Sequence, residues 1–224
     1  MARIAAVRNS SHRDAGPDPR DRRGQVRALP FAGDDEALVR GLRRRDPAAV
    51  AEFCERYSDH VMRVLARVLG ADTELSDLHH DVFVRALGAL PKIREPDRLK
   101  GWVSIIAVNV ARNALKRRYR QRWLRFGRSE ELPEAHAIEA SDEQNEALRR
   151  TYATLDQLPR EERIAFSLRI IDGMKLTEVA QACEVSLATI KRRLARAEAR
   201  FLTLARTDDV LADWIEGGRR WANR

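Results

Sequence analysis

Residues 175–201 read KLTEVAQACEVSLATIKRRLARAEARF, and their pattern predicts two short helices joined by a tight turn. Apolar residues recur at the spacings that pack the two helices together, with small Ala180 where they must approach closely. The second helix has an apolar back and a cationic front. Its cations are Lys191, Arg192, Arg193, Arg196 and Arg200. A helix-turn-helix of this kind suits the major groove of DNA.

The composition of the 224-residue chain favours a polyanionic partner. Charged residues make up 34% and hydrophobic residues 44%, with a net charge of +8 and a pI near 10.1. Nucleic acid is favoured over an anionic membrane. No apolar run approaches the roughly 20 residues of a membrane span, and the N-terminus lacks the apolar core of a signal peptide. The two cysteines, Cys54 and Cys183, lie at apolar positions of helical patterns, which indicates buried thiols. We therefore expect a cytoplasmic protein.

The remaining sequence is helical in pattern, and no stretch alternates like a strand. Start and stop signals include Asp34, the pair Asp46-Pro47 and Gly70. We expect an all-α fold of two small domains joined by a flexible acidic linker, with the helix-turn-helix in the second. The expected segments are a disordered basic tail (1–32), a first domain (33–126), the linker (127–141), a second domain (142–206) and a C-terminal extension (207–224). We expect the extension to dock on the second domain or on a regulator.

A second basic segment, KRRYRQRWLR at residues 116–125, ends the last predicted helix of the first domain. It interleaves cations, which can hold phosphates, with Tyr119 and Trp123, which can stack on unpaired bases. Such stacking contributes about 1–3 kcal/mol per base. Alternatively, the aromatic rings cover the domain core behind a solvated arginine face. Two basic surfaces, in two domains joined by a flexible linker, predict that the protein contacts nucleic acid at two places with an adjustable distance between them.

Both domains together resemble the sigma factors of bacterial RNA polymerase, specifically the extracytoplasmic-function (ECF) group. The resemblance spans roughly residues 34–126 and 143–206. It is carried by SDLHHDVFVRAL and KGWVSIIAVNVARNALKRR in the first domain, and by LDQLPREERIAFSLRIIDGMKLTEVA and SLATIKRRLARA in the second.

The resemblance implies a promoter-specificity subunit that recognises the −10 and −35 promoter elements and helps to open the duplex. Its implied partners are promoter DNA and core RNA polymerase, through the clamp helices of the largest subunit and the flap of the second-largest. Members of the family are often held by an anti-sigma factor. The resemblance implies no covalent chemistry and no cofactor.

The matched motifs assign three sets of site residues. The set implied to bind core polymerase is Asp77, Leu78, His80, Asp81 and Phe83, in which Asp77 and Asp81 form an acidic edge one helical turn apart. The set implied to read the −10 element is Asn109, Arg112, Asn113, Lys116, Arg117, Tyr119 and Arg120. The set implied to read the −35 element is Ser186, Thr189, Lys191, Arg192, Arg193 and Arg196, with Ser186 as the helix N-cap.

The chain departs from the family pattern at two places. His79 and His80 stand where the family usually has an aliphatic residue and Gln. Adjacent helical residues point about 100° apart, so the two imidazoles cannot easily share a metal ion, and we expect no metal site. In the turn of the helix-turn-helix, Glu184 replaces the usual Gly. A positive φ at this residue would cost roughly 1–2 kcal/mol.

Parts of the sequence also suggest two other functions. One is a helix-turn-helix regulator that binds promoter DNA without polymerase, commonly as a symmetric dimer. The segment SDLHHDVFVRAL and the basic-aromatic helix count against it. The other is a metal-dependent nuclease, which needs convergent carboxylates or His ligands in the basic region. The carboxylates gather instead in the linker and in the predicted polymerase-facing helix, and no phosphate-binding glycine loop is present.

Overall fold

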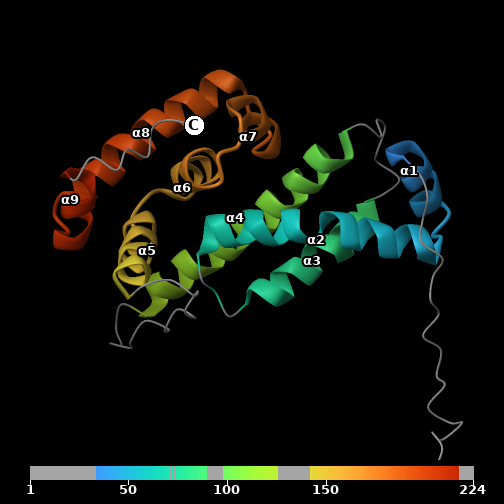
Figure 1. The fold of residues 1–224 in the computed structure, drawn as a ribbon, viewed down its shortest axis with the longest axis horizontal. Helices are drawn as coiled ribbons and strands as arrows, with labels where there is room; N and C mark the ends of the chain where they lie inside the picture. Colours follow the sequence, from blue (N-terminus) through green and yellow to red (C-terminus); the bar gives the residue numbers. More distant parts are fainter. Residues whose placement is uncertain (1–33, 71, 73, 90–97, 126–141, 217–224) are drawn as a thin grey trace, which may run out of the picture.

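The computed structural model describes residues 34–70, 72, 74–89, 98–125 and 142–216, and the regular structure within these ranges is helical. The N-terminal domain contains α1 (Asp35–Arg43), α2 (Pro47–Leu69), α3 (Leu75–Ala89) and α4 (Leu99–Arg125). The C-terminal domain contains α5 (Asp142–Leu155), α6 (Arg160–Phe166), α7 (Leu176–Ala182), α8 (Leu187–Ala205) and α9 (Asp209–Glu216). The expected all-α fold of two helical domains is confirmed (Figure 1). The expected tail (1–32) and linker (127–141) lie outside the described residues.

Local capping interactions set the ends of the first helices, as the sequence predicts. The side chain of Asp34 accepts a hydrogen bond from the Ala37 amide at 2.8 Å and begins α1. Asp46 caps α2 through the Ala48 amide at 2.9 Å, directly before Pro47. Gly70 ends α2 with φ 80°, a backbone conformation that is strained for residues with a Cβ but accessible to glycine.

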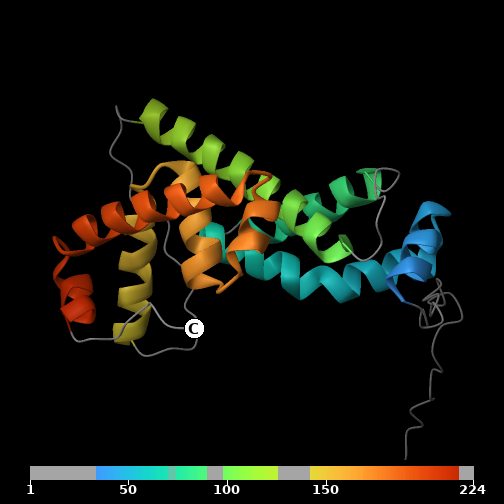
Figure 2. The same cartoon turned by 90° about the horizontal axis from the view of Figure 1, so that it is seen from above.

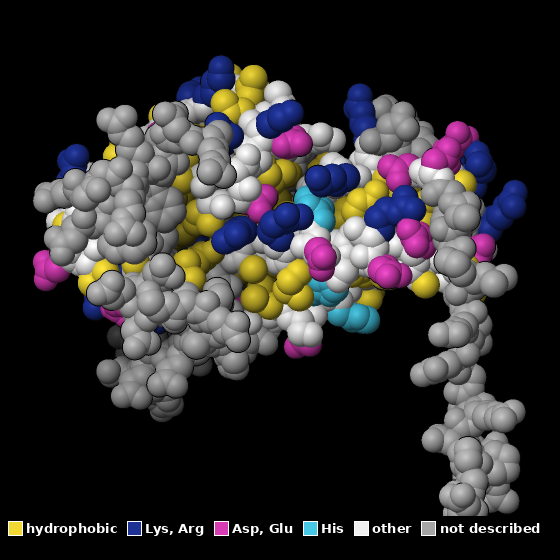
Figure 3. Space-filling model, viewed as in Figure 1, with side chains coloured by type: hydrophobic (Ala, Val, Ile, Leu, Met, Phe, Trp, Pro, Cys, Tyr) yellow, Lys and Arg dark blue, Asp and Glu magenta, His cyan; other side chains and the backbone are white. Residues whose placement is uncertain are grey.

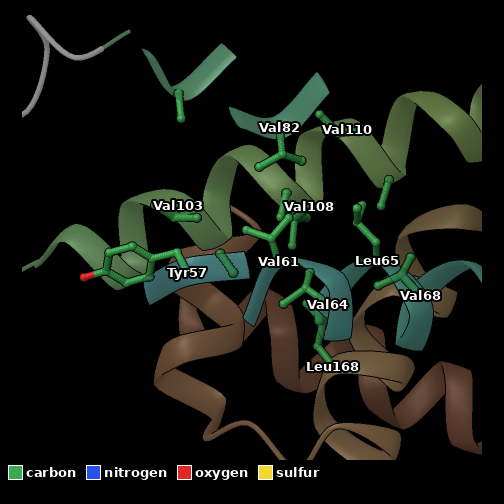
Figure 4. Packing of buried hydrophobic residues seen from close by; sticks show 14 of the residues in the cluster. Tyr57, Val61, Val64, Leu65, Val68, Val82, Val103, Val108, Val110 and Leu168 are labelled. Carbon is green, nitrogen blue, oxygen red and sulfur yellow. The ribbon is translucent and has the colours of Figure 1, made fainter. Parts of the chain in front are cut away.

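The core of the N-terminal domain lies between α2, α3 and α4. Phe53 of α2 is fully buried, and its ring packs against Tyr57 and Phe83 at centroid distances of 5.4 and 5.6 Å. Figure 4 shows the apolar side chains of α2, including Val61 and Leu65, facing those of α4. This packing fixes which faces of α3 and α4 remain available for partners.

The C-terminal domain has a smaller core in which the C-terminal extension takes part. Phe166 and Phe201 stack at 4.8 Å, and Leu211 of α9 is buried in the same cluster. Helix α9 lies beside α5 in both views (Figures 1 and 2). The described part of the extension, residues 207–216, therefore docks on the C-terminal domain, which was one of its two expected sites.

The helix that begins at Arg160 changes its winding part of the way along. Helix α6 ends at Phe166, and residues Ser167–Ile171 form a π-helical turn. Its defining bond runs from the Asp172 amide to the Ser167 carbonyl at 2.9 Å. The hydrophobic spacing did not predict this turn, because a π turn shifts the apolar register by only one residue.

The two domains pack against each other and share one buried apolar cluster. Leu168 and Val179 of the C-terminal domain belong to the same cluster as Val64 and Val108 of the N-terminal domain. Figure 4 shows Leu168 next to Val64 of α2. The sequence predicted two separate surfaces with adjustable spacing, and it gave no sign of this contact.

Candidate polymerase and nucleic-acid interfaces

Helix α3 presents an acidic edge to solvent. Asp77 and His80 are exposed, and Asp81 is partly exposed. The Arg85 guanidinium donates to Asp81 at 2.8 Å along the same face. Val84 is 53% exposed, which makes it one of the exposed large apolar side chains among the described residues. An acidic edge beside an exposed apolar residue suits a partner helix that carries cations.

Leu78 and Phe83, which the motif places in the polymerase-binding set, point into the core instead. Their relative exposures are 7% and 6%. Their burial anchors α3 and leaves direct contact to the exposed edge. His79 is also held from within, because its Nε2 lies 3.1 Å from Ser58 Oγ and its ring packs edge-on against Phe83 at 5.1 Å.

Part of the implied −10 set lies on an open face of α4. Asn113, Lys116, Arg117 and Arg120 are exposed. Arg117 forms an ion pair with Glu74 at 2.5 Å. Both partners of this pair are about half exposed (side-chain exposures of 44% and 52%), and pairs of this kind contribute little stability. These side chains can reach a phosphate backbone without a change in the fold.

The rest of the implied −10 set faces the C-terminal domain. The Asn109 amide donates to Glu184 Oε2 at 3.2 Å. The Tyr119 hydroxyl donates to the Leu158 carbonyl at 2.5 Å, and the ring packs on the shared cluster. In this arrangement, neither side chain is presented to a nucleic acid.

The recognition helix α8 begins as the sequence predicts. Ser186 Oγ accepts from the Thr189 amide at 3.2 Å and caps the helix. Lys191, Arg192 and Arg196 are exposed along its cationic face. On the molecular face shown in Figure 3, Lys and Arg are interspersed with acidic and apolar side chains.

The turn before α8 has the strained residue that the sequence analysis singled out. Glu184 adopts φ 56°, in the left-handed region that favours glycine. The turn closes through two backbone bonds of 3.0 Å, from Glu184 N to Gln181 O and from Val185 N to Ala180 O. The helix-turn-helix therefore keeps its geometry with a non-glycine residue in the turn.

One carboxylate of α6 joins the two implied promoter-reading sets. Glu161 accepts from Arg112 Nε at 3.0 Å through one oxygen and from Arg193 Nη1 at 3.1 Å through the other. Both arginine side chains are only 19% exposed. A cleft lies at this junction. It is lined by Lys116, Tyr119, Pro159, Arg160, Glu161, Glu162, Arg193 and Arg196.

A buried arginine of α6 caps the C-terminal end of α2. Arg163 is 1% exposed, and it donates to the Val68 carbonyl at 2.9 Å and to the Leu69 carbonyl at 3.1 Å. The Tyr152 hydroxyl of α5 lies over the same helix end. A helix C-terminus has unpaired carbonyls and a partial negative charge, so a guanidinium is a fitting cap. Sequence reasoning missed Glu161 and Arg163, because the run PREER at residues 159–163 reads simply as a helix start.

Burial shifts the pKa of His60 and of both cysteine thiols. Desolvation lowers the pKa of His60, whose Nε2 lies 2.7 Å from Ser104 Oγ. Burial raises the pKa of the Cys183 thiol to about 11, and it also raises the pKa of half-buried Cys54. Thiols with raised pKa are poor nucleophiles at neutral pH.

Among the described residues, no group of three or more His, Cys, Asp and Glu side chains is arranged to hold a metal ion. No helix in the same part of the chain has the length and apolar character that crossing a bilayer requires.

Comparison with known proteins identifies both domains. Residues 53–121 match the family model for sigma-70 region 2, and residues 148–201 match the model for sigma-70 region 4. The ECF RNA polymerase sigma-E factor of Escherichia coli is 27% identical over 180 residues, which cover 73% of this chain and 90% of that protein. The RNA polymerase sigma-H factor of Pseudomonas aeruginosa is 25% identical over 172 residues, which cover 73% of this chain and 89% of that protein.

Two solved structures share the fold. CnrH, in complex with the cytosolic domain of CnrY, superposes with a TM-score of 0.55 at 23% identity, covering 78% of this chain and 99% of CnrH. The sigma factor RpoE of Bartonella quintana, in complex with the anti-sigma factor NepR, gives a TM-score of 0.52 at 21% identity, covering 69% of this chain and 95% of RpoE. With region 2 and region 4 present in order and sigma factors among its relatives, the chain belongs to the ECF group of RNA polymerase sigma factors.

Proposed function

We propose that this sigma factor docks on core RNA polymerase through the exposed edge of α3 and reads the two promoter elements with α4 and α8. It then promotes duplex opening by holding unstacked bases, with no covalent chemistry and no cofactor, in the cytoplasm. The observation that carries the proposal is the combination of the two matched regions with three exposed surfaces of fitting chemistry. These surfaces are the acidic edge of α3, the cationic face of α4 and the capped recognition helix α8.

The direct test is run-off transcription with purified core polymerase on a template that carries the upstream region of the protein's own gene. We expect a transcript that depends on both proteins. A chain that binds promoter DNA but never binds core polymerase would instead be a helix-turn-helix regulator, and the proposal would be rejected.

The polymerase-docking surface is tested by Asp81→Arg. The substitution reverses the charge of the α3 edge, so core binding should fall by at least about tenfold, the factor that corresponds to 1.4 kcal/mol. Glu55→Arg is the matched control, because Glu55 is exposed on α2 and the charge change is the same. Equal loss of core binding in both variants would show a general charge effect and remove the assignment of α3.

The upstream-reading surface is tested by Arg192→Ala on duplex DNA that contains the −35 element. We expect weaker binding and a salt slope that is smaller by about 1, as for the loss of one phosphate contact. Arg206→Ala is the control, because Arg206 is an exposed cation at the far end of α8. An unchanged salt slope in Arg192→Ala would place the DNA elsewhere.

We also propose that an anti-sigma factor regulates this chain. The support is that solved RpoE of B. quintana is bound to the anti-sigma factor NepR, and that the fold is shared. A pull-down with the purified chain as bait, analysed for a protein that blocks run-off transcription, is the measurement.

A further inference from the structure

We propose that the upstream promoter element of this sigma factor contains a thymine whose methyl group is read by Leu187, the first residue of α8. The inference rests on the proposed function and adds a determinant of sequence specificity to it. Leu187 lies outside all three implied site sets, and every member of the implied −35 set is polar or charged.

Leu187 stands at the position where a recognition helix meets the bases. It directly follows the N-cap Ser186 and begins α8. In helix-turn-helix proteins, the N-terminal residues of the second helix contact base edges in the major groove. Leu187 is 38% exposed, which makes it one of the exposed large apolar side chains among the described residues. Its side chain therefore faces solvent at the end of α8 that enters the groove.

The two hydroxyl groups next to Leu187 are engaged within the helix cap. Ser186 Oγ accepts from the Thr189 amide at 3.2 Å and lies 2.9 Å from Thr189 Oγ1. The Arg192 guanidinium lies on the other side of the same Thr189 oxygen, at 3.5 Å. Ala188, the remaining residue of this turn, is exposed and has only a methyl group as its side chain. The first turn of α8 therefore presents two apolar side chains, those of Leu187 and Ala188, to a base.

Thymine is the base that offers a methyl group to the major groove. The other three bases present hydrogen-bond donors and acceptors there, whereas thymine presents its C5 methyl group beside one acceptor. A leucine side chain has no donor or acceptor, so it gains from a base edge only by burying apolar area. Against guanine or cytosine it would instead desolvate polar groups without pairing them. Leu187 therefore favours an A·T pair at this position.

Exposed cations beside Leu187 can hold the helix in the groove while the leucine contacts the base. Lys191 lies one helical turn after Leu187 on the same face, and Arg192 follows it; both are exposed. Contacts between such cations and phosphates fix the position of a protein on duplex DNA but carry no sequence information. In the first turn of α8, base discrimination then falls to Leu187.

The test uses RNA polymerase holoenzyme, reconstituted from core polymerase and the full chain, on the promoter upstream of the protein's own gene. Each thymine of the −35 element, on either strand, is replaced in turn by deoxyuridine, which lacks the methyl group and keeps the same base pairing. At one position, this change should weaken promoter binding about three- to fourfold, the factor expected for one buried methyl group. Fluorescence anisotropy of a labelled duplex gives the dissociation constants.

The substitution Leu187→Ala tests whether this residue is the reader. The variant should bind the thymine duplex more weakly by at least the same factor, and it should not distinguish thymine from deoxyuridine at that position. Leu202→Ala is the matched control, because Leu202 is 40% exposed near the far end of the same helix. It should keep the wild-type affinity and the full preference for thymine.

An upstream element without thymine on either strand would overturn the inference. Equal binding of the wild type to thymine and deoxyuridine at every position would overturn it too, as would a Leu187→Ala variant that keeps the preference for thymine. Run-off transcription from the unmodified promoter separates these failures from failure of the proposed function, because that function is rejected only when no transcript depends on the chain.

Discussion

Substitution of Gly70 by Ala tests the domain contact through stability alone. Gly70 ends α2 with φ 80° and ψ −165°, a region that is essentially limited to glycine. A Cβ at this position would also lie 2.8 Å from Cδ1 and 3.0 Å from Cγ of Tyr152, which belongs to the other domain. The change therefore adds backbone strain in the N-terminal domain and a steric clash between the domains.

The two effects have separate magnitudes. Backbone strain in this region costs about 1–3 kcal/mol. Overpacking against an aromatic ring costs about another 1–3 kcal/mol. The variant Gly70→Ala should therefore lower the free energy of unfolding by about 2–6 kcal/mol, which for a chain of this size lowers Tm by at least about 4 °C.

A double-mutant cycle in urea separates the two effects. The clash disappears when Tyr152 is also replaced by Ala, whereas the strain stays. The double variant should then be more stable than the sum of the single effects by about 1–3 kcal/mol. Gly173→Ala is the matched control, because Gly173 has the same φ of 80° and no atom within 4 Å of an added Cβ. Zero coupling, with Gly70→Ala no worse than Gly173→Ala, would refute the docking of α5 on the end of α2.

Three further variants test local features. Glu184→Gly should be more stable than Glu184→Ala by about 0.5 kcal/mol in urea. Both variants lose the bond from Asn109, but only glycine relieves the φ of 56°, and this relief exceeds the added entropy of the unfolded chain. A glycine variant less stable than the alanine variant would mean that the turn is not left-handed. Burial raises the pKa of the Cys183 thiol from 9.0 to about 11. The protonated thiol therefore stabilises the folded chain fully below pH 9, and this contribution is lost as pH rises to about 11. In Cys183→Ala, the free energy of unfolding should fall less steeply over this pH range. Desolvation lowers the pKa of His60 from 6.5, so as pH falls the unfolded chain binds a proton at this residue before the folded chain does. The free energy of unfolding should therefore decrease below about pH 6.5 in the wild type, and decrease less in His60→Gln.

Features that depend on neighbouring residues could be predicted from the sequence. The caps at Asp34, Asp46 and Ser186 were predicted because each side chain bonds an amide two or three residues further along. The strained turn at Glu184 was identified because the motif requires a left-handed residue at that position.

Features that depend on contacts far apart in sequence could not be predicted. Arg163 bonds carbonyls about 95 residues away, and no local pattern indicates that an arginine at a helix start will be buried by another domain. Glu161 has a sufficient local explanation, because acidic residues are favoured in the first turn of a helix. The sequence therefore gave no reason to expect that the Glu161 carboxylate bridges Arg112 and Arg193. Motif matching also placed Leu78 and Phe83 in the polymerase-binding set, but the structure buries both side chains in the core.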